Sequence, residues 1–336
     1  MQLFRYLLWP FSLVYAAGVH CRNLFYDWGI FRSQSFETPT LCIGNLSVGG
    51  TGKTPMIEYM IRLLEPHLDL AVLSRGYRRK SKGYLLGDSG STVQDLGDEP
   101  YQVFKKFPQV KVAVDADRIR GIQKLQADCS PELILLDDAF QHRRVLPTHS
   151  LVLTQFTNLY PRDFYLPMGR LRDARNQIKR AEGIFVTKCP ADLSQEKALE
   201  IEKELALSSH QQLFFSTLCY DTDLQGGEEP LPLSEMKDTP FALVTGIANP
   251  TPLLEHMDRM GLNYEHFRFA DHHYFTENDL FRFHNFEYIL CTEKDFTRLE
   301  GRVQRLYYLK VRHELLFDGK ERLKKTLFDW YGIVED

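Results

Sequence analysis

A glycine-rich run that ends in lysine and threonine is the part of the sequence best suited to chemistry. It comprises Gly49, Gly50, Thr51, Gly52, Lys53 and Thr54. Glycines let backbone N–H groups close around phosphate oxygens, and a helix that begins here adds the positive end of its dipole. The Lys53 ammonium would reach the β- and γ-phosphates, and the Thr54 hydroxyl would bind Mg²⁺. The pattern predicts a P-loop that binds a nucleoside triphosphate with Mg²⁺.

The residues on either side of this run favour the same interpretation. The apolar run 41–43 is typical of a buried strand, and Pro55 suits the first turn of a helix. Residues 56–64 then carry apolar side chains at helical spacing. Ser47 stands where the pattern G-x-x-x-x-G-K-[ST] has its first glycine. The alternative is a glycine-rich turn that contains lysine and threonine by chance.

Two acidic pairs lie close to predicted elements of the same unit. Asp137 and Asp138 end an apolar strand that begins at Leu133, the form of a Walker B element that holds Mg²⁺. Asp98 and Glu99 open a predicted helix. The second pair could serve only as an N-cap and a first-turn acid, which the helix dipole stabilises.

Four further side chains follow predicted strands or lie in the loops between them, where open α/β sheets bind ligands. They are Arg75, His142, Arg170 and Arg172. A guanidinium suits phosphate because its donors form a bidentate fork. The alternatives are a solvated basic loop, surface ion pairs and a structural histidine.

The second half of the chain contributes two loops to the same kind of edge. Asp271-His272-His273 follows a predicted strand at 264–269, and Thr292–Asp295 follows the strand at 288–291. Phosphoryl transfer to an alcohol needs a base near the hydroxyl, and Asp98 and His272 are the candidates. An Asp–His pair would orient the imidazole. The spacing does not reveal whether these two residues meet, and His272 could instead be buried or capping.

Length and composition bound the class of protein. The 336 residues suffice for two domains, and a formal net charge of -4 gives no indication of nucleic-acid binding. The six cysteines are scattered without a C-x-x-C pair, so we expect neither a zinc site nor a disulfide framework. A reducing cytosol fits this cysteine usage. Nothing in the sequence indicates an obligate protein partner.

The N-terminal segment, from Leu3 to Phe31, is rich in aromatic and aliphatic residues. Its most apolar stretch, 7–19, is shorter than the roughly 20 residues that span a bilayer. A signal peptide and a core helix are alternatives. We favour an interfacial helix with aromatic residues at the level of the lipid headgroups. The aromatic residues are Trp9, Tyr15, Tyr26 and Trp28, and the residues expected toward water are Arg5, His20 and Arg22.

Alternation of strands and helices predicts an α/β fold: a P-loop NTPase-like α/β/α sandwich, a second and smaller α/β domain, and an N-terminal membrane-associating helix. We place the boundaries at 1–31, 32–218 and 219–336. Residues 221–232 are expected to form a linker or a hairpin tip. The sequence does not decide whether the last helix, 320–330, packs on the second domain or returns to the first.

The ordered series of motifs resembles tetraacyldisaccharide 4'-kinase, the lipid A 4'-kinase family of Gram-negative bacteria. The resemblance runs from the apolar N-terminus to about residue 300. The segments that carry it are 44–55, 73–77, 97–100, 137–142, 166–173, 271–272 and 292–295.

The resemblance implies an ATP-dependent kinase that phosphorylates the 4'-hydroxyl of a tetraacylated glucosamine disaccharide 1-phosphate. Lys53 and the P-loop backbone would hold the ATP phosphates, and Asp98 paired with His272 would take the proton of the hydroxyl. Thr54 and Asp138, with Asp137 or Glu99, would organise Mg²⁺. Phosphate or substrate contacts would come from Arg75, His142, Arg170 and Arg172. The N-terminal helix would sit peripherally or monotopically in the cytoplasmic leaflet of the inner membrane.

Two positions depart from the family pattern, and two other functions compete. Ala139 replaces a glycine, and Asp173 replaces a glutamate that is one methylene longer. A membrane-associated P-loop ATPase of the partition or positioning type is the main alternative, but Val48 stands where its signature lysine would be. A regulatory NTP-binding module is the other; against it, acids and arginines cluster at strand ends, where chemistry occurs in α/β folds.

Overall fold

The computed structural model describes residues 6–227 and 229–334. Its helices are α2 (Trp9–Asp27), α3 (Lys53–Leu64), α4 (Val93–Leu96), α5 (Asp98–Lys106), α6 (Arg118–Cys129), α7 (Gln195–Leu205), α8 (Thr251–Arg259), α9 (Glu277–Phe281), α10 (Glu293–Leu299) and α11 (Gly319–Tyr331), with 3-10 turns η1 (Tyr160–Arg162), η2 (Arg175–Arg180) and η3 (Leu233–Lys237). Its strands are β1 (Thr40–Asn45), β2 (Leu70–Ser74), β3 (Leu85–Leu86), β4 (Lys111–Val114), β5 (Leu133–Asp137), β6 (His149–Gln155), β7 (Gly183–Thr187), β8 (Gln212–Gln225), β9 (Leu231–Pro232), β10 (Phe241–Thr245), β11 (Tyr264–Arg268), β12 (Ile289–Thr292) and β13 (Leu306–Leu315).

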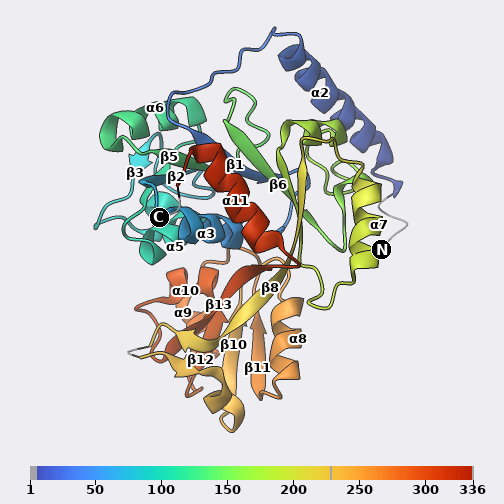
Figure 1. Cartoon of the computed structure of the whole chain (residues 1–336). Helices are drawn as coiled ribbons and strands as arrows, with labels where there is room; N and C mark the ends of the chain where they lie inside the picture. Colours follow the sequence, from blue (N-terminus) through green and yellow to red (C-terminus); the bar gives the residue numbers. More distant parts are fainter. Residues whose placement is uncertain (1–5, 228, 335–336) are drawn as a thin grey trace.

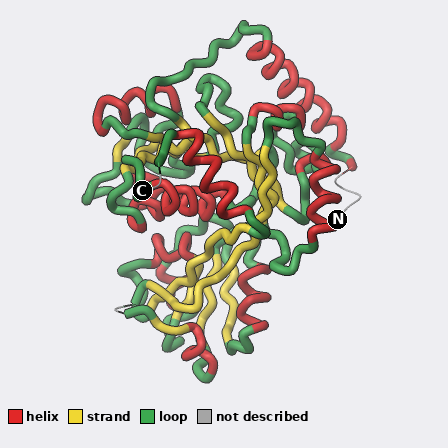
Figure 2. Tube along the Cα trace, viewed as in Figure 1, coloured by secondary structure: helices red, strands yellow, loops and turns green. Residues whose placement is uncertain are grey.

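One continuous sheet runs through the molecule in the order β11-β10-β12-β13-β8-β7-β6-β1-β5-β2-β4-β3, and β9 pairs with β8. We call the part built on β1 to β7 the first lobe and the part built on β9 to β12 the second lobe. The strands β8 and β13 belong to both, because β8 pairs in parallel with β7 at its start and antiparallel with β13 further on. Figure 2 shows these yellow strands continuing from one lobe into the other.

Helices cover both faces of the sheet in each lobe, as predicted for an α/β/α arrangement. In the first lobe α3, α5 and α11 pack on one face, and α6 and α7 pack on the other (Figure 1). In the second lobe α8 covers one face, and α9 and α10 cover the other. Along β10, Phe241 and Leu243 face one layer while Ala242 and Val244 face the other, the period-two alternation of a strand.

The structure answers two questions about the second half of the chain. Residues 221–225 continue β8, and β9 turns back antiparallel to it, so the hairpin prediction is confirmed and the linker prediction is wrong. The last helix returns to the first lobe, where Leu323 and Leu327 join the core and Trp330 stacks on His149 at 4.1 Å. The predicted domain boundary after residue 218 falls within β8. That residues 32–218 and 219–336 are separate domains stays a prediction.

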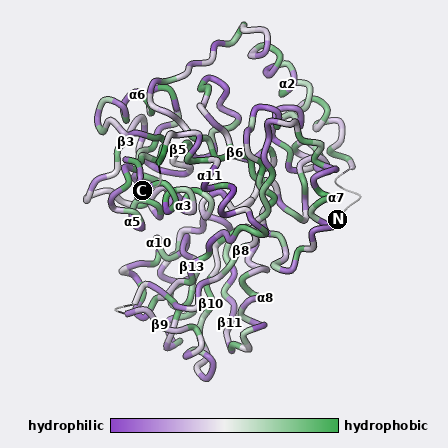
Figure 3. The backbone as a smooth tube through the Cα atoms, in the orientation of Figure 1, coloured by the Kyte–Doolittle hydropathy of each residue, from purple (hydrophilic) through white to green (hydrophobic). Residues whose placement is uncertain are grey.

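The first described helix, α2, lies along the outer edge of the first lobe (Figure 1). Its buried positions include polar side chains: Ser12 donates to the Tyr165 carbonyl at 3.0 Å, and Asn23 donates to Asp173 at 2.8 Å. Figure 3 shows that hydrophobic residues otherwise concentrate in the strands of the central sheet. Val19 is buried, but most of the large apolar side chains of α2 are exposed; among them are Trp9, Phe11, Leu13, Val14 and Leu24. The prediction of a core helix is therefore wrong.

The detailed prediction for this segment holds only in part. Trp9 and Trp28 are more than half exposed, as expected. Tyr15 and Tyr26 face the protein instead, because Tyr15 donates to the Arg172 carbonyl and Tyr26 lies beneath the Arg143 guanidinium. Arg22 turns toward Asp173 rather than fully to water, and Arg5 lies outside the described residues. No helix in the described ranges is both long and apolar enough to cross a bilayer.

Candidate active site

The glycine-rich run forms the predicted turn between a buried strand and a helix. The strand β1 ends at Asn45, and α3 begins at Lys53, three residues before the expected start because Pro55 is tolerated in the first turn. Gly52 precedes the helix with φ +89°, a conformation that favours glycine. A Cβ atom there would also lie 2.8 Å from His313 Nε2. Local backbone and a distant strand therefore both require glycine at this position.

The carbonyl groups of the loop are held by donors from the surrounding strands. Gln155 donates to the Gly50 carbonyl at 2.9 Å, and Thr187 donates to the Thr51 carbonyl at 2.8 Å. His313 on β13 donates from Nε2 to the Gly52 carbonyl at 2.9 Å; burial lowers its pKa to about 4 and keeps it neutral. Bonds of this kind fix the loop in a shape whose helix N-terminus can receive an anion.

Asp138 meets two cations beside the P-loop. Its carboxylate lies 3.7 Å from the Lys53 ammonium and accepts two hydrogen bonds from Arg172, one of them at 3.0 Å. Burial alone would raise the pKa of Asp138, but Lys53 and Arg172 outweigh it and hold that pKa well below its usual range. Asp138 therefore stays charged.

Asp137 is in the opposite electrostatic situation. Burial, with the neighbouring charges of Glu99 and Asp138, raises the pKa of Asp137 to about 6. Ser74 donates to this carboxylate at 2.8 Å, and Arg118 donates to the Asp137 carbonyl at 3.0 Å. The carboxylates of Glu99, Asp137 and Asp138 therefore lie close enough to repel one another, and nearby cations offset only part of their negative charge.

This charge pattern fits a divalent cation. Mg²⁺ is usually held by one or two carboxylates together with phosphates and water, rather than by a complete protein cage. The side chains that could hold it are Thr54, Asp137, Asp138 and Glu99. Within residues 6–227 and 229–334, no group of three or more His, Cys, Asp or Glu side chains forms a complete metal site.

The structure brings Asp98 and His272 together across the two lobes. His272 Nδ1 lies 2.6 Å from Asp98 Oδ2, and Arg298 Nε donates to Oδ1 at 2.9 Å. A second nitrogen of Arg298 donates to Oδ2. Burial would raise the pKa of Asp98, but the hydrogen bonds from His272 and Arg298 outweigh it and hold the pKa well below its usual range. Asp98 is therefore an anion that fixes the imidazole.

A lysine approaches the other nitrogen of the same imidazole. Lys294 Nζ lies 3.0 Å from His272 Nε2 and 3.6 Å from a carboxylate oxygen of Glu99. An ammonium can only donate. The network therefore assigns the ring proton to Nδ1, facing Asp98, and leaves Nε2 as an acceptor.

Sequence reasoning missed the roles of Lys294 and Arg298. It placed 292–295 in a loop, whereas Thr292 caps α10 and the helix begins at Glu293. On a helix, residues four apart lie on the same face, so Lys294 and Arg298 both reach the Asp98–His272 pair. In the sequence, two basic residues four positions apart, directly after a predicted strand, could have indicated that both side chains reach this site.

The other predicted contacts surround the P-loop and the acids. Arg172 binds Asp138, and the Arg170 guanidinium lies near Gly49, with Nη1 4.0 Å from where a Cβ there would be. Arg75 is exposed, and its charge acts on half-buried His142, whose pKa is lowered by burial and nearby arginines. Lys188, which follows β7, also approaches the P-loop and was missed.

Asp173, at the position where the resemblance implied a longer acid, contacts α2. It is fully buried and accepts hydrogen bonds from Asn23 at 2.8 Å and from the Ala174 backbone at 2.8 Å. The shorter side chain therefore anchors α2 to the segment that carries Arg172.

A buried charge network joins the elements that carry the site. Lys106, at the end of α5, lies 2.7 Å from Glu58 on α3 and 2.6 Å from Glu293 on α10. Two carboxylates thus share one ammonium. Burial, with the charge of Glu58, raises the pKa of Glu293 to about 7. The network connects the P-loop helix, the helix that begins with Asp98 and the helix that carries Arg298.

Glu293→Gln is expected to stabilise the protein at alkaline pH. The folded-state pKa of Glu293 exceeds its ordinary value of 4.5, so its contribution to stability is complete below that value and is lost as the pH rises through about 7. The shift corresponds to at most about 3 kcal/mol. Thermal unfolding of the variant should show a higher Tm than wild type at pH 8 and a similar Tm at pH 5.

Glu300→Gln is the matched control for this experiment. Glu300 follows α10 and pairs with Lys105 at 3.6 Å, but its side chain is 44% exposed. An exposed pair contributes little, so no pH-dependent change in Tm is expected. Equal destabilisation of Glu293→Gln at pH 5 and pH 8 would contradict the account.

A P-loop with neighbouring acids, beside an Asp–His pair formed between the first lobe and the second, is arranged to move a phosphoryl group to an acceptor, which places the chain among the P-loop kinases. It belongs to the tetraacyldisaccharide-1-P 4'-kinase family, LpxK, whose model matches residues 4–330.

Known proteins resemble the chain over nearly its whole length. Tetraacyldisaccharide 4'-kinase of Flavobacterium johnsoniae is 45% identical over 329 residues, covering 95% of this chain and 96% of that protein. The enzyme of the same name from Bacteroides thetaiotaomicron is 41% identical, covering 96% and 92%. A crystal structure described as the apo form of LpxK from Aquifex aeolicus in complex with ATP superposes with a TM-score of 0.80 at 28% identity, covering 98% and 99%.

Proposed function

We propose that this protein transfers the γ-phosphoryl group of ATP to the 4'-hydroxyl of a tetraacylated glucosamine disaccharide 1-phosphate, a step of lipid A biosynthesis. Family membership supports the reaction, and the ATP complex of the Aquifex relative supports the donor. The partition-type ATPase and the regulatory module are not proposed, because neither accounts for a base assembled from two lobes.

In this proposal the P-loop holds the donor and the surrounding cations neutralise the transferred group. Lys53 belongs to the loop, and Arg170 and Lys188 approach it from two other segments of the chain. Positive charge fixed in advance around the γ-phosphate stabilises the transition state. Arg75 and His142 flank the acids and are proposed to contact phosphate or sugar.

Asp138, Thr54 and one of Asp137 and Glu99 would hold Mg²⁺. When bound, the cation would supply positive charge beside the phosphates and offset the negative charge that raises the pKa of Asp137.

His272 Nε2 is the atom proposed to take the proton of the hydroxyl. Both oxygens of Asp98 are occupied by Arg298 and His272, and its low pKa makes it a poor proton acceptor. The acceptor hydroxyl would displace Lys294 from Nε2 and donate there. Asp98 would then stabilise the imidazolium that forms, as in other Asp–His pairs.

The observation that carries this proposal is the Asp98–His272 hydrogen bond between the lobes. The direct test is a mass-spectrometric assay with ATP, Mg²⁺ and the acylated disaccharide 1-phosphate in detergent micelles. The expected product is heavier by one phosphate, located on the 4'-oxygen. ATP hydrolysis without a phosphorylated lipid would refute the proposal.

The outward face of α2 supports peripheral attachment to the inner membrane from the cytoplasmic side. Burial of apolar side chains in the headgroup region would favour binding by roughly 25 cal/mol for each Å² removed from water. Phe11, at 65% exposed, and Val14, at 74%, offer such area. The acylated acceptor would then be reached without leaving the bilayer.

The double substitution Phe11→Ser/Val14→Ser is expected to weaken binding to vesicles several-fold. These side chains are exposed, so the polar contacts of Ser12 and Asn23 with the first lobe remain. Deletion of residues 1–31 would instead remove Arg22 and Asn23, the partners of Asp173 on α2. Sedimentation with liposomes measures the effect, and Leu199→Ser, at an exposed leucine on α7, is the control. Undiminished sedimentation of the double variant would argue against the interfacial helix.

A further inference from the structure

A buried histidine joins the two strands shared by the lobes to the glycine-rich loop. His313 lies on β13, and its Nε2 donates to the Gly52 carbonyl at 2.9 Å. Its other ring nitrogen, Nδ1, lies 3.0 Å from the hydroxyl of Ser216 on β8. His313 is 2% exposed and Ser216 is 0% exposed, so water does not compete for either bond.

The partners of His313 fix which of its nitrogens carries the proton. A carbonyl oxygen only accepts, so Nε2 must donate to Gly52. Burial, which lowers the pKa of His313 to about 4, keeps the ring neutral, and a neutral imidazole has one donor and one acceptor. Nδ1 is therefore the acceptor, and the Ser216 hydroxyl is its donor. Ser216 thus holds the tautomer that the Gly52 carbonyl requires.

The bond from His313 is made at the most adaptable position of the loop. Gly52 has a φ of +89° and no Cβ, so the peptide plane that follows it can rotate more easily than elsewhere. Its carbonyl accepts from Met56 N at 3.1 Å, within the first turn of α3, and from His313 as a second donor. Two donors on one oxygen hold the plane between Gly52 and Lys53 in one orientation.

The orientation of this plane decides where the Lys53 amide points. In a planar trans peptide the C=O group and the following N–H group point in opposite directions. A Gly52 carbonyl held toward His313 therefore turns the Lys53 N–H the other way. The first N–H groups of a helix have no partner within it and can bind an anion at its N-terminus.

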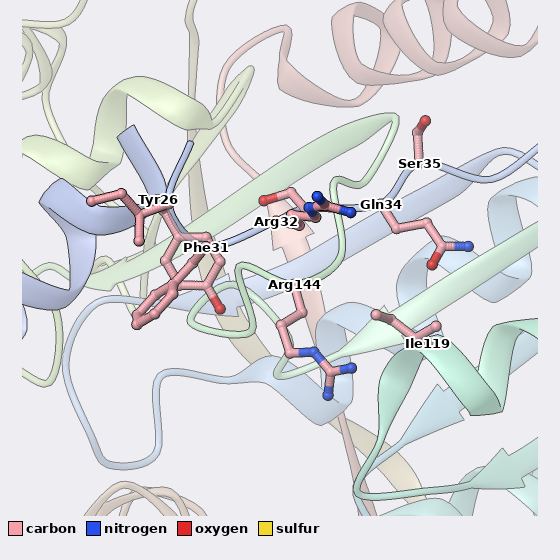
Figure 4. Close-up of a pocket in the computed structure, with 9 residues that line it drawn as sticks. Tyr26, Phe31, Arg32, Gln34, Ser35, Ile119 and Arg144 are labelled. Carbon is pink, nitrogen blue, oxygen red and sulfur yellow. The ribbon is translucent and has the colours of Figure 1, made fainter. Parts of the chain in front are cut away.

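His313 acts on the loop from the packed interior rather than from a ligand cavity. The structure has a cavity of about 820 Å³ between the end of α2 and the start of α6, lined by residues 30–35 with Tyr26, Ile119 and Arg144 (Figure 4). His313 does not line it, and a Cβ atom on Gly52 would lie only 2.8 Å from His313 Nε2. A side chain packed this closely behind the loop influences a nucleotide through the backbone that it touches.

We propose that His313, held by Ser216, is a positioning residue that presets the Lys53 amide for the β- and γ-phosphates of ATP. This inference rests on the proposed function, because it takes ATP as the phosphoryl donor. In this role His313 touches neither substrate. A loop already in its binding shape loses less freedom when ATP binds, and a donor fixed in advance also stabilises the transferred group in the transition state.

His313→Leu fills the site with a side chain that cannot donate. The Kd for ATP with Mg²⁺, measured without acceptor, should rise several-fold, and kcat/KM for ATP should fall about tenfold, the upper range for one buried hydrogen bond. The KM for the lipid acceptor should stay unchanged, because the acceptor is placed at His272. His313→Gln, whose amide can donate from nearly the position of Nε2, should restore most of the loss. His266→Leu on β11 is the matched control, since half-buried His266 lies 2.8 Å from the Thr245 hydroxyl in the second lobe.

Ser216→Ala tests the tautomer, and it decides the matter if His313→Leu fails to fold. Without the hydroxyl, the ring can carry its proton on Nδ1, and Nε2 would then face the Gly52 carbonyl as a second acceptor. The Kd for ATP should rise by a smaller factor than in His313→Leu, and ¹⁵N NMR of labelled histidine should show loss of the pure Nε2–H form. The double variant should bind ATP no more weakly than His313→Leu, because Ser216 acts through the ring.

The outcomes separate this inference from the proposed function. Unchanged ATP binding in His313→Leu and Ser216→Ala overturns the positioning role. So does an equal loss in His313→Leu and His313→Gln, or an equal rise in the KM values for ATP and the acceptor, since a purely structural role would give these results. If the wild type binds ATP but phosphorylates no lipid, the proposed function fails, while the Kd values for ATP still decide the role of His313.

Discussion

Asp98→Ala and His272→Ala are each expected to lower kcat about 10²–10⁴-fold while ATP affinity stays nearly unchanged, because a positioned base contributes that much and neither residue belongs to the P-loop. Asp98→Ala removes the carboxylate that fixes the imidazole and leaves Arg298 buried without its main partner. His272→Ala removes the proposed proton acceptor itself. Steady-state kinetics of lipid phosphorylation and titration of an ATP analogue measure the two quantities.

Comparison of the two variants distinguishes the roles of the pair. Because the residues act as a unit, a double Asp98→Ala/His272→Ala variant should be scarcely slower than the worse single variant. His273→Ala is the control, since His273 neighbours the site but bonds Asp279 at 2.9 Å. Unchanged turnover in both single variants, or fully additive losses, would show that the pair is not the base.

Lys53→Ala is expected to lower kcat at least 10²–10³-fold, the loss typical when one fixed donor to the transition state is removed. Lys53 begins α3, its side chain is 16% exposed, and its ammonium already lies beside Asp138. Without Lys53, the transferred group would lose a cation of the P-loop, and Asp138 would keep only Arg172 as a paired cation. ATP affinity should fall as well, whereas Asp98→Ala and His272→Ala are expected to leave it nearly unchanged.

Thermal unfolding establishes that Lys53→Ala still folds, and Lys203→Ala, at an exposed position on α7, controls for loss of a lysine. An alanine variant with wild-type kcat and ATP affinity would show that Lys53 does not contact the phosphates.

The sequence was most informative where function imposes a local pattern. The P-loop, the strand ending at Asp137 and the helix opening at Asp98 all lie where their residues predict, because strand, turn and helix signals coincide there. The long strand β8 escaped prediction, since exposed polar residues toward its end break the apolar pattern. Tertiary pairing with β13, rather than local preference, stabilises this part of β8.

The residues that sequence reasoning missed reach the site from far along the chain. Arg298 lies 200 positions from Asp98, and His313 lies 261 positions from Gly52. The spacing of residues along the sequence cannot predict such contacts, because they depend on how the two lobes pack together. The orientation of α2 was equally hidden: its composition predicts an apolar surface, but only the contacts of Ser12 and Asn23 reveal which face the protein takes.

The passage of β8 and β13 through both lobes, with one register shift between Leu309 and Val311, has a mechanical consequence. A two-stranded ribbon can twist and bend but is stiffer than a loop, so any swing of the second lobe would twist or bend these strands. His313 lies on β13 of this ribbon and donates a hydrogen bond to the Gly52 carbonyl. A twist of the ribbon that moved His272 away from Asp98 would therefore also displace the Gly52 carbonyl. Opening of the acceptor site and loosening of the nucleotide loop would then be coupled.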